Sequence, residues 1–157
     1  MTDLLALSSA VIDGQTSAAS IGPLNRINFE LSEIADRVAV VEAFSHCVLF
    51  ETNDGLLAFD TSGFHGGEKV ISAIRGWRSE PFHSLVYTHG HLDHVGGCGA
   101  FIADAKSRGY ARPQIVGHEN VPKRFDRYKL TDGYNRVINQ RQFGQFTRRG
   151  YEIQDGN

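Results

Sequence analysis

Cysteine is scarce in this sequence, and long apolar runs are missing from it. Only Cys47 and Cys98 occur among 157 residues, which is too few for a disulfide framework and indicates a reducing compartment. No apolar run is long enough to cross a bilayer. The first twenty residues carry an early Asp3 and lack the basic segment of a secretory signal. We therefore expect a cytoplasmic protein without a membrane partner.

An excess of one charge is also lacking, because 16 Lys and Arg residues nearly balance 18 Asp and Glu residues, for a net charge of −2. This balance indicates no partner class for the chain as a whole. The 41% hydrophobic and 22% charged content is typical of a soluble globular domain, and 157 residues suit one such domain. We expect an N-terminal arm over residues 1–27, as a loose segment or a short helix, and one domain over 28–157.

Short apolar, β-prone runs dominate the first part of the domain. They lie at 38–41, 46–51 and 56–59. Asn53-Asp54-Gly55 separates the last two runs, and Asp-Gly between apolar runs is a strong hairpin signal. The sequence therefore predicts an antiparallel meander in this region.

Strands and helices alternate after the meander. The pattern predicts helices at 68–77 and 95–108, and strands at 83–88 and 114–116. Such alternation predicts parallel pairing of the strands through right-handed crossovers. Gly109 is expected to end the second helix. The predicted fold class is therefore α/β.

Four side chains able to bind a metal follow the strand at 83–88 within six residues: His89, His91, Asp93 and His94. Neutral imidazole suits zinc, copper, iron or nickel, and a carboxylate adds a hard oxygen ligand. In extended backbone, His89 and His91 point the same way and could hold one cation. Asp93 and His94 could face a second cation beside it. Open α/β sheets place their sites on such loops, at the carboxyl ends of strands.

The run from His89 to His94 resembles the HxHxDH signature of the metallo-β-lactamase superfamily, and the match is complete. The resemblance implies an αββα sandwich, of which this chain looks like the first half only. It implies that His89 and His91 bind one metal and that Asp93 and His94 bind a second. Asp93 would also orient the nucleophilic water. The implied cofactor is Zn²⁺, as two ions in a complete site, with iron or manganese as alternatives.

The expected function is metal-dependent hydrolysis of a small-molecule ester, amide, thioester or sulfate ester. Asp93 is the expected catalytic residue, because a carboxylate beside the attacking water can also take up a proton. The alternative is a non-catalytic metal-binding remnant. No histidine follows His118, so the distal ligands of a complete dinuclear site are not identified. The sequence also leaves a homo-oligomer open.

Three further residues each allow two interpretations. Asp60 ends a predicted strand in an Asp-Thr-Ser-Gly turn. In the resembled family such a turn lies under the metal loop, where Asp60 would accept the free ring N–H of a ligand histidine; otherwise Asp60 caps the turn or the next helix. His118 follows the last strand and is either a metal ligand or a residue of a helix start or pocket wall. His65 either borders the pocket or lies on the surface.

Basic and aromatic side chains are interleaved between residues 121 and 149. One interpretation is a nucleic-acid-binding surface. The favoured interpretation is two helices with solvated basic faces, because no recognition module is visible, and we therefore expect no nucleic-acid partner. Weak similarity of residues 118–135 to the alkylsulfatase-like branch suggests instead that arginines hold a sulfate or carboxylate. The basic residues are Lys123, Arg124, Arg127, Lys129, Arg136, Arg141, Arg148 and Arg149.

Overall fold

The computed structural model describes residues 3–17, 20 and 26–147. The chain divides into two compact units, Met1–Glu119 and Asn120–Asn157. A short helix, α1 (Leu4–Ile12), lies in the predicted N-terminal arm, and the side chain of Asp3 accepts a hydrogen bond from the Ala6 amide at its start. No helix in the described part of the chain combines the length and the apolar character that a membrane span requires.

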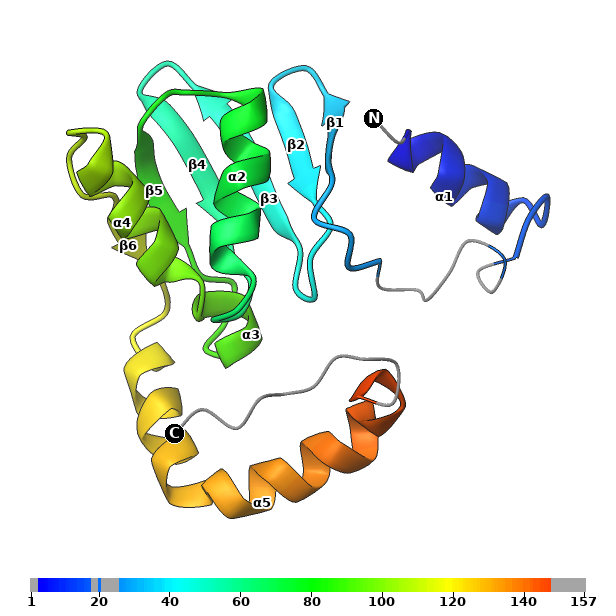
Figure 1. Ribbon diagram of the computed structural model, residues 1–157, viewed down its shortest axis with the longest axis vertical. Helices are drawn as coiled ribbons and strands as arrows, with labels where there is room; N and C mark the ends of the chain where they lie inside the picture. The colour runs from blue at the N-terminus through cyan, green and yellow to red at the C-terminus, as the bar shows by residue number, and fades with distance from the viewer. Residues whose placement is uncertain (1–2, 18–19, 21–25, 148–157) are drawn as a thin grey trace. The chain divides into compact units, whose positions relative to one another are not determined.

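A six-stranded sheet forms the centre of the first unit, with its strands in sequence order (Figure 1). The first four strands pair antiparallel, and the last three pair parallel. The predicted meander and the predicted parallel pairing are therefore both confirmed. The strands are β1 (Leu31–Ala35), β2 (Val38–Val41), β3 (Cys47–Thr52), β4 (Gly55–Phe59), β5 (Phe82–Val86) and β6 (Gln114–Val116).

The predicted hairpin between β3 and β4 forms for a local reason. Gly55 has a φ of 118°, a backbone angle that residues other than glycine rarely adopt. The Thr52 hydroxyl donates to the Gly55 carbonyl at 2.6 Å and accepts from the Asp54 amide at 3.2 Å. Strand β1 was not predicted, because its short sequence Leu-Ser-Glu-Ile-Ala alternates too weakly to stand out.

Two helices cover one face of the sheet, α2 (Gly67–Trp77) and α4 (Cys98–Ser107). Figure 1 shows α2 lying across the strands on that face. Phe101 of α4 packs against Phe82 of β5, with ring centroids 4.9 Å apart. This single helical layer on a sheet is one half of the predicted αββα sandwich. The buried core consists of Ala39, Val41, Ala43, Cys47, Leu49, Leu56, Ala58, Val70, Ile74, Phe82, Leu85 and Phe101.

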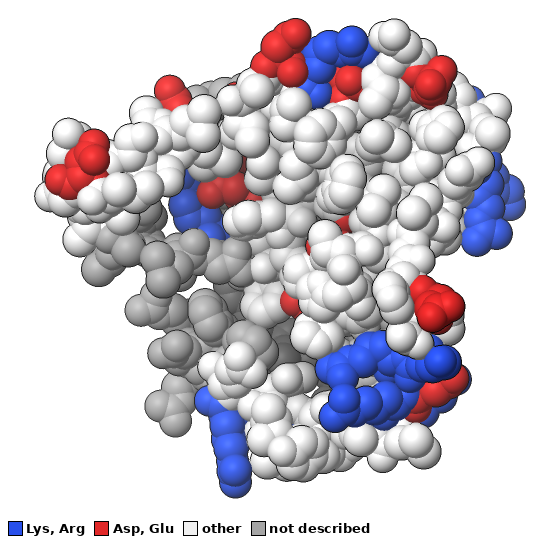
Figure 2. All heavy atoms as spheres, turned by 180° about the vertical axis from the view of Figure 1, so that it is seen from behind, with Lys and Arg blue, Asp and Glu red and all other residues white. Residues whose placement is uncertain are grey.

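The alternate residues of the strands point to the opposite face of the sheet. Phe50 is exposed there, and its ring meets that of Phe59 edge-on at 5.5 Å. Seen from that side, the surface over the strands carries few charged side chains (Figure 2). The residues of this face are apolar but only half-buried or exposed, and none belongs to the core: Val38, Val40, Val48, Phe50, Leu57, Phe59, Val86 and Val116.

The helix predicted over 95–108 is divided in the structure. A single turn, α3 (Leu92–Val95), precedes Gly96 and Gly97, and α4 begins at Cys98. At Gly97 a Cβ would overlap the Thr61 carbonyl. The chain therefore packs its backbone directly against the turn after β4, and glycine makes that approach sterically allowed. Gly109 ends α4 with a φ of 71°, as predicted.

An ion-pair network joins α2 to α4. Arg75 donates from Nε to Asp104 Oδ2 at 3.0 Å, and Arg108 donates to Oδ1 of the same carboxylate at 2.9 Å. Arg75 also donates to the carbonyls of Arg78 and Glu80, beyond the end of α2. Both side chains of the Arg75–Asp104 pair are 8% exposed. Each nitrogen of the Arg75 guanidinium group thus has a hydrogen-bond partner, and the buried pair links α2 to α4.

The second unit contains one long helical stretch, α5 (Val121–Thr147). It has a kink at Thr131, so it contains two helical segments, as predicted. The Thr131 hydroxyl donates to the Arg127 carbonyl at 2.9 Å, and such a bond tends to bend a helix. Two of its basic residues pair with acids: Lys129 with Asp126 and Arg136 with Asp132. Arg148 and Arg149, part of the predicted basic segment, lie outside the described residues.

Candidate metal centre

Three loops meet at one end of the sheet. They are the loop 42–46 between β2 and β3, the turn that follows β4 at Asp60, and the loop 87–91 that follows β5. The strand register brings them together, because Val48 pairs with Phe59 and Phe59 pairs with Val86. The histidine cluster therefore lies at the carboxyl end of a parallel strand, as the sequence predicted.

Asp60 is the central polar group of this end of the sheet. Its side chain accepts hydrogen bonds from the Thr88 amide at 2.9 Å, the Thr88 hydroxyl at 2.6 Å and the Nδ1 of His94 at 2.7 Å. The residue is 5% exposed and has a φ of 58°, in the left-handed region that Asp tolerates better than most residues. The structure thus places Asp60 where the first of its two predicted roles requires, against a ring nitrogen of His94.

These hydrogen bonds decide the tautomers of two histidines. The Asp60 carboxylate only accepts, so in a neutral His94 the proton lies on Nδ1 and Nε2 keeps the lone pair. The Thr88 hydroxyl gives its proton to Asp60, so at 3.0 Å it accepts from the Nδ1 of His89. In a neutral His89 the lone pair is therefore also on Nε2. These hydrogen bonds thus favour, in both imidazoles, the tautomer that offers Nε2 to a metal ion.

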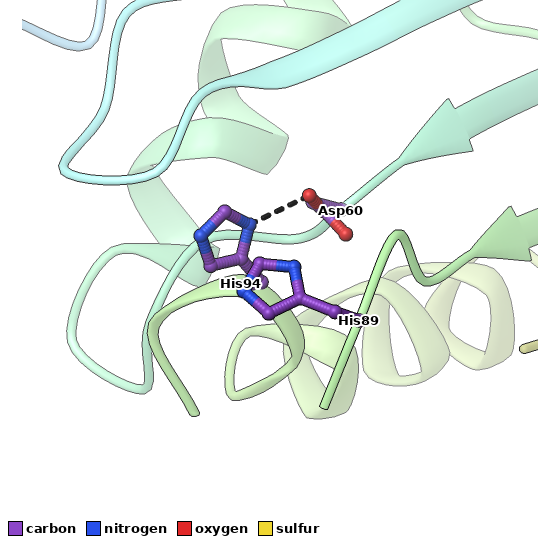
Figure 3. A group of neighbouring side chains, drawn as sticks. All are labelled: Asp60, His89 and His94. Carbon is purple, nitrogen blue, oxygen red and sulfur yellow. Dashed lines mark hydrogen bonds and ion pairs between the residues drawn. The ribbon is translucent and has the colours of Figure 1, made fainter. Parts of the chain in front are cut away.

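Asp60, His89 and His94 form a group with the spacing of a metal site, and Figure 3 shows the three side chains converging. One ligand atom from each residue lies within 4.8 Å of the others. The His89 and His94 ring centroids are 4.1 Å apart. Imidazole nitrogens beside carboxylate oxygens suit zinc, iron or manganese. The residues present therefore fit a divalent metal ion of the predicted kind.

The other two members of the predicted ligand set lie beside this group. The ring of His91 is exposed and meets that of His89 edge-on, with centroids 4.4 Å apart. Oδ2 of Asp93 lies 3.5 Å from Nε2 of His94. His91 and Asp93 begin α3, so the start of this short helix carries both side chains at the site. All four predicted ligands are thus neighbours in space, and their ligand role stays a prediction.

The remaining histidines lie at the surface. His65 and His118 are exposed, and neither belongs to the group formed by Asp60, His89 and His94. His83 is the second residue of β5, near the end of the strand remote from the site, and its ring is hydrogen-bonded to Ser84. The surface interpretation of His65 agrees with its exposure, and whether His118 ligates a metal stays a prediction.

The two cysteines differ in their surroundings. Cys47 is fully buried in the core, and Cys98 is half-buried. Burial, and then the negative charge of Asp60, raise the pKa of the Cys47 thiol far above its ordinary value. Cys47 is therefore a protonated core residue that acts as a small apolar side chain. Cys98 packs against the edge of that core.

Sequence reasoning missed two residues whose side chains contact this region. Thr88 precedes the first histidine, but nothing in a single sequence assigns its hydroxyl to Asp60. Ser45 donates from Oγ to Asp93 Oδ2 at 2.7 Å across 48 residues of chain. No spacing rule connects residues so far apart, so only the sheet register could reveal this contact.

A family model described as the metallo-beta-lactamase superfamily matches residues 40–154. The matched range contains Ser45, Asp60 and the whole histidine cluster. Comparison with curated proteins gave no match.

Several solved structures are similar to this chain. One is a double mutant of the sec-alkyl sulfatase PisA1 from Pseudomonas sp., with 21% sequence identity and a TM-score of 0.48. The match covers 60% of this chain and 15% of that one. The metallo-beta-lactamase MIM-1 from Novosphingobium pentaromativorans has 20% identity and a TM-score of 0.48, covering 62% and 37%. BJP-1, a subclass B3 metallo-beta-lactamase of Bradyrhizobium japonicum, has 22% identity and a TM-score of 0.46, covering 61% and 35%. This chain thus spans about 15% to 37% of their lengths.

Proposed function

This chain belongs to the metallo-beta-lactamase superfamily, and on that premise we propose that it takes part in metal-dependent hydrolysis. The observation that supports the proposal is the convergence of Asp60, His89 and His94 at the end of the sheet. We propose His89, His91, Asp93 and His94 as the metal ligands. Asp60 positions two of them, because its carboxylate holds the Nδ1 of His94 directly and reaches His89 through the Thr88 hydroxyl.

A bound divalent ion lowers the pKa of a coordinated water and polarises the bond to be cleaved. The chain's own residues prepare the place for that chemistry. Asp60 and Thr88 fix the His94 and His89 rings with Nε2 as the free nitrogen. Rings held in this way need little reorganisation when a cation binds, so less binding free energy is lost in ordering them.

Asp93 is the residue we propose to act on the attacking water. Its carboxylate is 38% exposed and lies beside the His94 ring. A carboxylate with one solvent-facing side can accept a hydrogen bond from water and take up its proton. Ser45 occupies one lone pair of Oδ2, so the other carboxylate positions stay available for this work.

The metal and the substrate belong to the same proposal. We propose zinc, with iron or manganese as the alternatives that the same ligand atoms accept. We propose a small molecule with an ester, amide, thioester or sulfate ester bond as the substrate, acted on in the cytoplasm.

The test is metal binding followed by hydrolysis. Zinc is titrated into the metal-free protein, and His94→Ala is compared with His83→Ala, a histidine at the remote end of the same sheet. We expect wild type and His83→Ala to bind zinc and His94→Ala to lose it. Wild type should then hydrolyse a chromogenic ester or sulfate ester, and a chelator should abolish the rate.

Two outcomes would contradict the proposal. If wild type and His94→Ala bound zinc equally weakly, the cluster would not be a metal site. If zinc bound tightly but no ester, amide, thioester or sulfate ester were cleaved, the chain would be a metal-binding protein without the proposed activity.

A further inference from the structure

Ser45 connects a second loop to the candidate metal centre. It lies in the loop 42–46, is 5% exposed, and donates from Oγ to Oδ2 of Asp93 at 2.7 Å. We propose that Ser45 is a positioning residue that sets the orientation of the Asp93 carboxylate toward the cation. This inference rests on the proposed function, because it assigns Asp93 to that cation.

The geometry around Asp93 explains why such a residue is needed. The side chain is 38% exposed, so water alone would leave the carboxylate free to rotate about its last torsion angle. Oδ2 lies 2.7 Å from the Ser45 hydroxyl and 3.5 Å from Nε2 of His94. A hydroxyl has one proton to donate, and here that proton goes to Oδ2. The hydrogen bond therefore selects one orientation of the carboxylate plane.

The loop that carries Ser45 is itself held in place. The ring Nδ1 of His46 is hydrogen-bonded to the Ala43 carbonyl at 3.0 Å, and Ala43 is fully buried. The backbone of Glu42 exchanges hydrogen bonds with Phe29 and Glu30, at 2.9 and 3.0 Å. The Ser45 hydroxyl is thus preset by packing rather than by binding, as a group that orients a ligand must be.

The experiment compares the zinc affinity of wild type, Ser45→Ala and Ser45→Thr, measured by competition with a chromophoric chelator. Removal of a group that orients a metal ligand weakens affinity by about tenfold or more. We expect this loss in Ser45→Ala and recovery in Ser45→Thr, which keeps the hydroxyl. Bound Co²⁺ should show an altered absorption spectrum in Ser45→Ala, because the ligand geometry around it changes.

Ser32→Ala is the matched control. Ser32 is a buried serine of β1 in the same sheet, at 1% exposure, and its Oγ has no hydrogen-bond partner among the described residues. Its removal should leave both the zinc affinity and the Co²⁺ spectrum unchanged. Thermal unfolding of the metal-free variants shows that each is folded before its affinity is compared.

A double-mutant cycle tests whether Ser45 acts through Asp93. If it does, Ser45→Ala in an Asp93→Ala background weakens zinc binding no further. An equal tenfold loss in both backgrounds would overturn the inference, and so would an unchanged affinity of Ser45→Ala. If wild type itself does not bind zinc, the proposed function fails before Ser45 is tested, so the two failures are distinguishable.

Discussion

Asp60 combines a strained backbone with three hydrogen bonds. A non-glycine residue in the left-handed region is uncommon, and it persists where the surroundings hold it. Here the Thr88 amide, the Thr88 hydroxyl and His94 all donate to its carboxylate. These three hydrogen bonds therefore hold Asp60 in this conformation beneath the loop that carries the histidine cluster.

Asp60→Asn tests whether the Asp60 carboxylate is needed as a hydrogen-bond acceptor, because it replaces one carboxylate oxygen by an NH₂ group. The variant keeps the size of the side chain and tolerates the same backbone, but its amide group turns a donor toward groups that also donate. We expect zinc affinity to fall by about ten- to a hundredfold, measured by chelator competition. Unchanged affinity would show that His94 does not depend on Asp60.

The buried Cys47 thiol should not react with an alkylating reagent while the protein is folded. Cys47 is inaccessible, and burial followed by the Asp60 charge raises its pKa, so little thiolate forms in the folded protein. We expect iodoacetamide to leave Cys47 unmodified in buffer and to modify it in denaturant. Peptide mass spectrometry after alkylation in both conditions provides the measurement. Modification of Cys47 in buffer would mean that this part of the core opens.

At the scale of elements, the contact between α4 and the turn after β4 depends on glycine. A Cβ at Gly97 would overlap the Thr61 carbonyl and lie 3.1 Å from the Gly67 Cα. Backbone atoms cannot move aside as a flexible side chain can. The division of the predicted helix into α3 and α4 follows from this approach.

Gly97→Ala should therefore destabilise the fold by about 1–3 kcal/mol, the usual effect of overpacking. Gly99→Ala is the control, because a Cβ at Gly99, in the first turn of α4, would meet nothing within 4 Å. Alanine there should be neutral or stabilising by up to about 1 kcal/mol. Urea unfolding of both variants gives the comparison. Equal stabilities would show that the turn can move away from α4.

The ion-pair network between α2 and α4 predicts a pH dependence of stability. Burial alone would raise the pKa of Asp104, but hydrogen bonds from Arg75 and Arg108 and their positive charges bring it below 3.8. A folded-state pKa below the unfolded one contributes stability that is present above the unfolded value. That contribution is lost as the pH falls through the folded-state pKa.

Asp104→Asn should remove this contribution. Loss of one partner of a buried pair leaves Arg75 uncompensated and costs about 3 kcal/mol near pH 7. We expect the difference in unfolding free energy between wild type and Asp104→Asn to shrink between about pH 6 and about pH 3. Urea unfolding at both pH values measures it. A difference that stays constant with pH would mean that the Asp104 pKa is not lowered by folding.

At the scale of the whole molecule, the sheet, its helical layer and the candidate metal centre all belong to the first unit, Met1–Glu119. The buried core lies between Ala39 and Phe101. The apolar second face of the sheet (Figure 2) belongs to the same unit, so this unit carries both the site and an apolar surface that lies opposite α2 and α4.

A chain that ends at Glu119 should fold and keep the proposed metal site. We expect cooperative thermal unfolding and a zinc affinity equal to that of the full chain, because none of the proposed ligands lies beyond His94. Circular dichroism and zinc titration of the two chains test this. Loss of zinc binding in a folded truncated chain would place a ligand in residues 120–157.

Local sequence was enough to predict much of this protein. The Asp-Gly hairpin, the alternation of strands and helices, and the cluster of proposed ligands from His89 to His94 are each encoded within a short stretch of the chain. Backbone periodicity and ligand chemistry act over that range, so a single sequence reveals them. The α/β class and the superfamily followed from the same features.

The long-range contacts depended on the folded sheet. Ser45 reaches Asp93 across 48 residues, and the choice between the two predicted roles of Asp60 was made by its contact with His94 across 34 residues. Three further features also depended on the folded sheet: the tautomers of His89 and His94, the pairing of the weakly patterned β1, and the close approach at Gly97. Each arises from strand register and backbone packing, which bring distant segments together and leave no periodic signal along the chain.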